Sequence, residues 1–266
     1  RKRFAACGDV LDIAVRMLPR APHPFLERSR LASARAAVRD ADRAAFLQDA
    51  ARDDLRALAL DPAEESAAVE LVGVYQRLRR PDDAQQALES AVAARPRSAV
   101  LQRLRGRLFA DQADAVHRKW EDQDRLSRSL YQSEAVRKEA SAKAKQLYVE
   151  AAERYARAEE ALQRALEIDS ADGGAIWNLA VIRYNRNDFP EALRWFDRLR
   201  QVSKDPSDVA TATYWSGICQ ELMFQFEPAL KNYEEYLAAR PDGKLATQAR
   251  EGAERMRKHL KDRKQP

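Results

Sequence analysis

The sequence predicts an all-α chain of stacked helical hairpins, and three observations lead to that prediction. The 266 residues are rich in Ala, Arg, Leu and Glu, which favour helices, and contain only eight Gly and eleven Pro. Apolar residues recur at three- and four-residue spacing in segments that short turns separate. Paired segments of this kind return at a nearly constant interval, as they do in proteins whose hairpins cover one another's apolar faces.

The clearest pair of helices occupies residues 65–98. Its first half carries an apolar stripe that includes Val72, at a spacing that places the stripe on one helical face. Pro81 follows a break in the pattern and stands where a second helix can begin. Ala84 and Ala91 in that second helix are small enough to let two helices cross closely. A hairpin of this size cannot bury its own apolar face, so we expect neighbours of the same kind.

This pair resembles the tetratricopeptide repeat, a helix–turn–helix unit of about 34 residues. The residues that match in order are Leu71, Tyr75, Ala84, Leu88, Ala91 and Pro96. The pair departs from the family pattern at Ala68, where tryptophan is preferred, and at Val72, where glycine or alanine is preferred. The resemblance implies a right-handed α-solenoid in which the first helix of each hairpin lines the concave side.

Other segments keep the same phase. Gly106 follows Val72 by 34 residues, which is one period. Gly217 to Ala229 and Ala229 to Pro241 are both 12 residues, the spacing found in the clearest pair. We therefore expect about five to six hairpins in the solenoid.

The N-terminal segment is less regular. A turn at Gly8 and a short helix over residues 10–18 are expected, followed by an extended or kinked connector at Pro19, Pro22 and Pro24. Two interpretations remain open for this segment: a degenerate half-repeat or an irregular N-terminal cap.

The middle of the chain predicts two lengthened helices, because residues 107–172 contain neither Pro nor Gly. We expect a tight turn within residues 126–133; the alternative is one very long helix. Ala158 is expected to pair with the first-helix position Gln146. Residues 119–145 are charged nearly all round, which indicates either a solvated protrusion or a docking arm for a partner.

The chain is expected to close with an amphipathic helix over residues 245–260 that caps the solenoid, followed by a basic tail. Gly173 and Gly174 are expected at the end of a helix, where a residue at positive φ is needed. The expected segments are residues 1–30 (half-repeat or cap), 31–110 (N-terminal repeat units), 111–157 (lengthened charged helices), 158–243 (C-terminal repeat units) and 244–266 (capping helix and tail).

Catalytic and metal-binding patterns are missing from the sequence. It has no HExxH, no GxSxG and no glycine-rich phosphate loop, and its three histidines lie far apart. Cys7 and Cys219 are too few for a disulfide framework and form no CxxC pair. We therefore expect a protein that is not an enzyme, with no cofactor and no metal.

Charge and hydropathy narrow the range of partners and compartments. The net charge of 47 − 42 = +5 is spread over mixed-sign helices, which argues against nucleic-acid binding and for a mild preference for acidic partners. No apolar run approaches the ~20 residues of a membrane span. A cytoplasmic location is favoured. A periplasmic or membrane-anchored one stays open, since the chain begins without Met and Cys7 ends a faint lipoprotein-like motif.

The resemblance implies a scaffold that binds a partner peptide or helix in its concave groove, within a larger assembly. Arginine and aromatic residues anchor many interfaces, so the partner is expected to carry acidic and apolar anchors. The groove positions implied by the resemblance include Arg35, Arg39, Arg103, Arg107, Trp177, Tyr184 and Tyr214. Two alternatives are a regulatory or sensor domain of a larger protein and, less favoured, nucleic-acid binding through the arginine-rich half. The sequence does not predict an oligomeric state.

Overall fold

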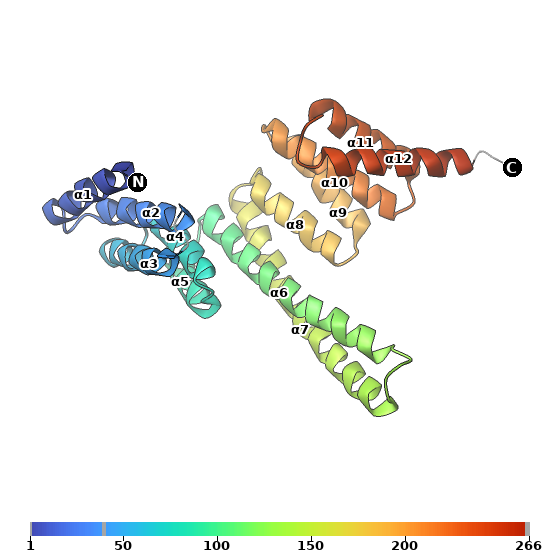
Figure 1. Cartoon of the computed structure of the whole chain (residues 1–266), viewed down its shortest axis with the longest axis horizontal. Coiled ribbons are helices and arrows are strands. Elements are labelled where there is room, and N and C mark those ends of the chain that lie inside the picture. Colours follow the sequence, from blue (N-terminus) through green and yellow to red (C-terminus); the bar gives the residue numbers. More distant parts are fainter. Residues whose placement is uncertain (1, 39–40, 264–266) are drawn as a thin grey trace. The chain divides into compact units, whose positions relative to one another are not determined.

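The computed structural model describes residues 2–38 and 41–263 and shows twelve α-helices and no strand within them (Figure 1). The predicted all-α class is therefore confirmed. The helices are α1 (Lys2–Met17), α2 (Pro22–Val38), α3 (Arg43–Leu60), α4 (Glu65–Arg77), α5 (Pro81–Ala94), α6 (Ala99–Ser127), α7 (Glu134–Ile168), α8 (Gly173–Asn185), α9 (Phe189–Val202), α10 (Pro206–Leu222), α11 (Phe226–Ala239) and α12 (Ala246–Asp262). The chain divides into two units, residues 1–105 and residues 106–266.

In the first unit each helix packs on the next, from α1 to α5. The α4–α5 hairpin forms where the sequence predicts it, and Pro81 is at the start of α5. Val72 of α4 and Ala84 of α5 are both fully buried. A valine is therefore accommodated where the family prefers glycine or alanine.

The N-terminal segment differs from the prediction in two places. Gly8 lies inside α1 rather than in a turn, and the Arg35 guanidinium fills the space that a side chain at residue 8 would need. Pro22 and Pro24 belong to the first turn of α2 instead of a connector. Proline is tolerated there because the first backbone N–H groups of a helix have no partner within the helix.

The predicted lengthened helices are α6 and α7, of 29 and 35 residues; α6 begins in the first unit and continues into the second. Glu134 begins α7 shortly after α6 ends at Ser127, so the single long helix is excluded. We call residues 112–154 the arm; its two helices run side by side and are joined at one end by the turn (Figure 1).

The pairing of these two helices corrects the expectation for Ala158. A Cβ atom on Gly106 would lie 2.5 Å from Leu162 Cγ and 3.0 Å from the Ala158 carbonyl oxygen, so Gly106, rather than Gln146, is the close partner of Ala158. The interval between them is 158 − 106 = 52 residues, against 12 between Val72 and Ala84. The α6–α7 hairpin is therefore an ordinary hairpin lengthened by 52 − 12 = 40 residues.

Three hairpin turns share one backbone conformation. Arg79, Asn187 and Phe224 each follow the first helix of a hairpin and adopt φ values of 58°, 60° and 59°. In the first of these turns the N–H of Arg80 donates to the Tyr75 carbonyl at 2.9 Å, and the other two turns make the same contact. This is the Schellman arrangement, which satisfies carbonyl groups left over at the end of a helix.

None of these positive-φ residues is a glycine, and every glycine among the described residues has negative φ. The prediction for Gly173 and Gly174 was therefore wrong, since both open α8 instead of ending a helix. Asp172 precedes them, and its carboxylate accepts a hydrogen bond from the Ala175 N–H at 3.0 Å. An aspartate cap before the helix accounts for this boundary.

From α7 to α12 each helix of the second unit packs on the next. The amphipathic helix predicted over residues 245–260 is confirmed as α12, which buries Ala249, Ala253 and Met256. Tyr233 of α11 is fully buried, and its ring lies against Gly217 of α10 and Gly252 of α12. Two glycines on neighbouring helices thus make room for one aromatic ring.

Two glycines in helix interiors give a matched test of helix spacing. Gly106→Ala should lower the free energy of unfolding by about 1–3 kcal/mol, because its methyl group meets Leu162 and the Ala158 backbone. Gly73→Ala should raise it by about 0.5–1 kcal/mol, because, apart from the backbone of its own helix, nothing lies within 4 Å of the new methyl group. Urea titration of both variants measures the two changes. A stabilised Gly106→Ala variant would contradict the close contact.

Asp54 of α3 is a buried carboxyl group in the first unit, with 0% of its surface exposed. Burial raises its pKa from the usual 3.8 to about 7; the nearby Glu70 and Asp53 act in the same direction, and the Ser29 hydroxyl opposes them. The native state therefore keeps a proton that the unfolded state has already released between about pH 4 and pH 7.

The stability of the first unit should consequently fall as the pH rises through that range, because the native state binds more protons than the unfolded state. Asp54→Asn should flatten this dependence and raise the urea midpoint at pH 8 relative to the unsubstituted chain. Asp49→Asn, which replaces an exposed carboxylate on the same helix, is the matched control and should leave the dependence unchanged. Equal slopes for the Asp54→Asn and unsubstituted chains would contradict the assignment.

Candidate functional site

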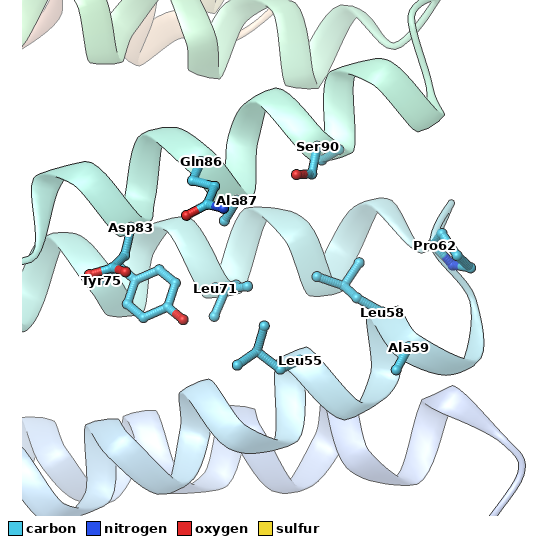
Figure 2. Close-up of a pocket in the computed structure, with 11 residues that line it drawn as sticks. Leu55, Leu58, Ala59, Pro62, Leu71, Tyr75, Asp83, Gln86, Ala87 and Ser90 are labelled. Carbon is cyan, nitrogen blue, oxygen red and sulfur yellow. The ribbon is translucent and has the colours of Figure 1, made fainter.

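An apolar groove of about 450 Å³ lies in the first unit between α3 and α5 (Figure 2). Its floor is formed by Leu71 and Tyr75 of α4, which are both buried. Figure 2 shows side chains of α3 and α5 along its two sides. The residues along those sides and at the end are Leu55, Leu58, Ala59, Pro62, Asp83, Gln86, Ala87, Ser90 and Ala91.

The two sides of this α3–α5 groove differ in polarity. Leu55 and Leu58 are three residues apart on α3, so they share one face, and Leu55 is 50% exposed. On α5, Asp83 and Gln86 are at the same spacing and give that side a polar rim. The groove therefore offers an apolar wall, an apolar floor and a hydrogen-bonding edge.

One end of the groove is held by Arg80. Its guanidinium donates to the Asp83 carboxylate at 2.7 Å and lies 5.0 Å from the centre of the Tyr75 ring. These contacts tie the turn between α4 and α5 to the groove floor. Since the pair is on the surface, we assign it a positioning role rather than a large contribution to stability.

A second hollow, of about 390 Å³, lies in the second unit, and we call it the notch. One side comes from the arm part of α6, and the other from the ends of α8 and α10 and the start of α9. The lining residues are Asp114, His117, Arg118, Glu121, Tyr184, Asn185, Asn187, Phe189 and Leu222. The notch exists because α6 continues past the point at which an unlengthened first helix would end.

Hydrogen bonds fix the inner side of the notch. The Tyr155 hydroxyl donates to Asp114 Oδ1 at 2.5 Å, and Asn185 Nδ2 donates to both Asp114 oxygens at 3.1 and 3.2 Å. Burial, with this bond to a carboxylate, raises the pKa of Tyr155. The tyrosine therefore stays a donor throughout the neutral range, and Asp114 is held in place as an acceptor.

The predicted aromatic site residues lie in the second unit. Trp177 is half-buried with its ring centre 5.5 Å from Phe196, and Tyr184 lines the notch with its ring 5.1 Å from Trp215. Tyr214 is only 6% exposed and packs in the core. Trp177 and Tyr184 remain partly exposed, so a partner could contact them. Tyr214 is buried, and its ring centre lies 5.8 Å from that of Trp215.

The predicted arginines do not share one environment. The Arg35 guanidinium donates to the Phe4 carbonyl, within the α1–α2 pair. Arg103 is half-buried and Arg107 is exposed, four residues apart on α6. Arg39 lies outside the described residues. Elsewhere in the first unit Arg28 makes two hydrogen bonds to the Asp53 carboxylate, at 2.8 and 2.6 Å, so its charge is matched locally.

The α3–α5 groove was not predicted from the sequence. Its one sequence signal is that Leu55 and Leu58 add a second apolar stripe to α3, beside the buried stripe that includes Ala50 and Ala57. The notch gave no such signal, because it depends on Gly106, rather than Gln146, being the partner of Ala158.

The described residues hold no group of three or more His, Cys, Asp and Glu side chains arranged to bind a metal ion. Burial raises the pKa of the Cys219 thiol to about 12, which keeps it protonated and unreactive. Within residues 2–38 and 41–263, every helix is too short or too polar to cross a bilayer.

Comparison with known proteins agrees with the repeat pattern. Residues 150–213 match the tetratricopeptide repeat family. Among solved structures, YrrB, described as a tetratricopeptide repeat protein with an unusual peptide-binding site, aligns with a TM-score of 0.53 and 19% identity, over 92% of this chain and 99% of its own. This chain has the tetratricopeptide repeat fold. No curated protein matches its sequence.

Two further solved structures align with this chain. Yeast Tom70 aligns with a TM-score of 0.64 and 14% identity, over 97% of this chain and 44% of its own. TTC0263, a tetratricopeptide repeat protein of Thermus thermophilus, aligns at 0.54 and 13%, over 87% of this chain and 98% of its own. When the helices are paired into repeats, α4, α6, α8 and α10 are each the first helix of a hairpin. The notch is thus lined mainly by first helices, whereas the sides of the α3–α5 groove are second helices.

Proposed function

We propose that this chain is a non-catalytic scaffold that binds a segment of a partner protein, and that the α3–α5 groove is one place where it does so. The observation that carries the proposal is a groove of about 450 Å³ with a half-exposed leucine along its side and an apolar floor. The tetratricopeptide repeat fold supports it, because stacked hairpins expose extended surfaces suited to binding another chain.

The groove fits an amphipathic helix or a short extended segment. An apolar anchor of the partner would cover Leu55 and Leu58 and reach Leu71, and its polar side would face Asp83 and Gln86 on α5. Completing the burial of a half-exposed leucine contributes on the order of 1 kcal/mol. Several such contacts, together with hydrogen bonds at the rim, are enough for the moderate affinity of a scaffold.

The face formed by first helices in the second unit supports the same function. There Trp177 and Tyr184 present half-buried rings, which are common interface anchors. Nucleic-acid binding is less well supported, since arginines such as Arg28, Arg80 and Arg183 are paired with carboxylates. We further propose that binding serves the assembly of a larger complex.

A peptide selection tests the groove. A phage-displayed library of random dodecapeptides, selected on the whole chain, should give binders with apolar residues at helical spacing. Leu55→Glu should weaken these binders at least about tenfold, or about 1.4 kcal/mol, because it places a carboxylate in the apolar wall. Val38→Glu is the matched control, since Val38 is an exposed apolar residue outside the groove of the same unit.

Fluorescence anisotropy with labelled peptides measures the affinities. Peptides bound equally by the unsubstituted chain and the Leu55→Glu variant would show that the groove is not their site. A loss of binding in Val38→Glu of the same size would mean that the added charge, rather than the groove, matters.

A further inference from the structure

Phe224 lies in an unusual place for a phenylalanine. It follows α10 with a φ of 59° and is 75% exposed. A bulky side chain is an outlier at positive φ, where Asn and Gly are the residues that fit best. The equivalent turn of the preceding hairpin has Asn187. Phe224 thus combines an unfavourable backbone conformation with a ring that the rest of the chain leaves largely uncovered.

Phe224 belongs to a short apolar strip beside the notch. Leu222, at the end of α10, is 43% exposed and lines the notch. Phe226 begins α11, and its ring centre lies 6.3 Å from that of Phe224 in an edge-on arrangement. We call Leu222, Phe224 and Phe226 the strip; it continues the surface of the notch across the α10–α11 turn.

Cations stand at both ends of this surface. Arg118 is exposed and lines the notch together with Leu222. At the other end the Arg263 guanidinium lies 5.5 Å from the centre of the Phe226 ring, and His259 stacks on the same ring at 4.7 Å. Between residues 255 and 263 there are five Lys and Arg against one Asp, a formal charge of 5 − 1 = +4.

The nearby acids offset this charge only in part. Glu221 accepts hydrogen bonds from Arg255 at 2.9 and 3.2 Å and from Tyr233 at 2.5 Å, and Glu234 pairs with Arg257 at 2.7 Å. Glu121 lies 3.8 Å from the His117 ring nitrogen. Glu227 is the acid exposed next to the strip. Because Asp114 and Glu121 line the notch beside Arg118, it is the Arg263 end of the strip that favours a negatively charged partner.

We propose that the notch and the strip form a second docking surface, for a protein segment that carries an aliphatic or aromatic anchor flanked by carboxylates. The anchor packs on Leu222 and Phe224, and the carboxylates meet Arg263 and the basic end of α12. This accounts for an exposed ring in an unfavourable conformation, because strained residues persist where function needs them. The surface is separate from the α3–α5 groove, and neither proposal requires the other.

Phe224→Asn separates a binding role from a structural one. Asn adopts positive φ more readily than Phe, so the variant should be at least as stable as the unsubstituted chain in urea. It also removes the ring, so binding should be lost. A structural role for Phe224 predicts the reverse for stability. Phe224→Tyr keeps the ring and should keep binding.

The experiment selects the random dodecapeptide library on the full chain carrying Leu55→Glu, which disables the α3–α5 groove. Selected peptides should combine Asp or Glu with an aliphatic or aromatic residue. Phe224→Asn, added to that chain, should weaken them at least tenfold in anisotropy titrations. Arg263→Ser should weaken them less, and raising the salt concentration should remove most of that smaller effect.

Three results would overturn the proposal. They are a selection without acidic–apolar peptides, selected peptides that bind equally well after Phe224→Asn, and a Phe224→Asn variant less stable than its parent. Sedimentation analysis tests whether a second copy of the chain occupies this surface instead. Self-association of the unsubstituted chain that is lost in Phe224→Asn would show that it does. Failure of this selection leaves the groove test unaffected, because that test scores Leu55→Glu against peptides selected on the unsubstituted chain.

Discussion

The hairpins of this structure are held by close helix crossings, each with a small buried alanine on the second helix. Helix axes that approach to about 8–10 Å leave little room between them. Ala84, Ala158 and Ala229 occupy such contacts in three hairpins, and all are completely buried. Gly106 faces Ala158 from α6 with no side chain at all. Because these crossings recur, each hairpin presents a similar apolar face to the next.

The arm arises because the α6–α7 hairpin is longer than the others while its helix crossing is kept. The contact between Gly106 and Ala158 is kept, while the helices beyond it gain 52 − 12 = 40 residues. The added wall along α6 then creates the notch beside α8 and α10. A length change that leaves the crossing intact has thus produced a surface that the shorter hairpins lack.

Much of the fold could be predicted from the sequence because the apolar spacing and the turn residues agree. Pro81, the stripe of α12 and the two lengthened helices all followed from such agreement. Predictions failed where one residue type serves two purposes. Pro22 can end a connector or begin a helix, and Gly173 can end one helix or follow an aspartate that caps the next. Ala158 has the right size for several partners, and only tertiary packing selects Gly106.

The functional surfaces were less predictable for a similar reason. Sequence identified Trp177, Tyr184 and Tyr214 as aromatic residues of first helices, but it could not tell which ring stays accessible and which fills the core. Leu55 of the α3–α5 groove resembles any other core leucine until its neighbours are placed. Whether a side chain is exposed depends on how the hairpins pack together, and the spacing of apolar residues within one helix does not predict it.

The contact between Gly106 and Ala158 makes α6 and α7 one ordinary hairpin with an inserted arm. Replacing residues 112–154 by the Leu-Arg-Arg turn of residues 78–80 removes 43 residues, adds three and returns the Gly106–Ala158 interval to 12. The shortened chain should still unfold cooperatively in urea, with a circular dichroism signal reduced only by the helix removed. Loss of cooperative unfolding in residues 155–263, with helix lost beyond the excised segment, would contradict it.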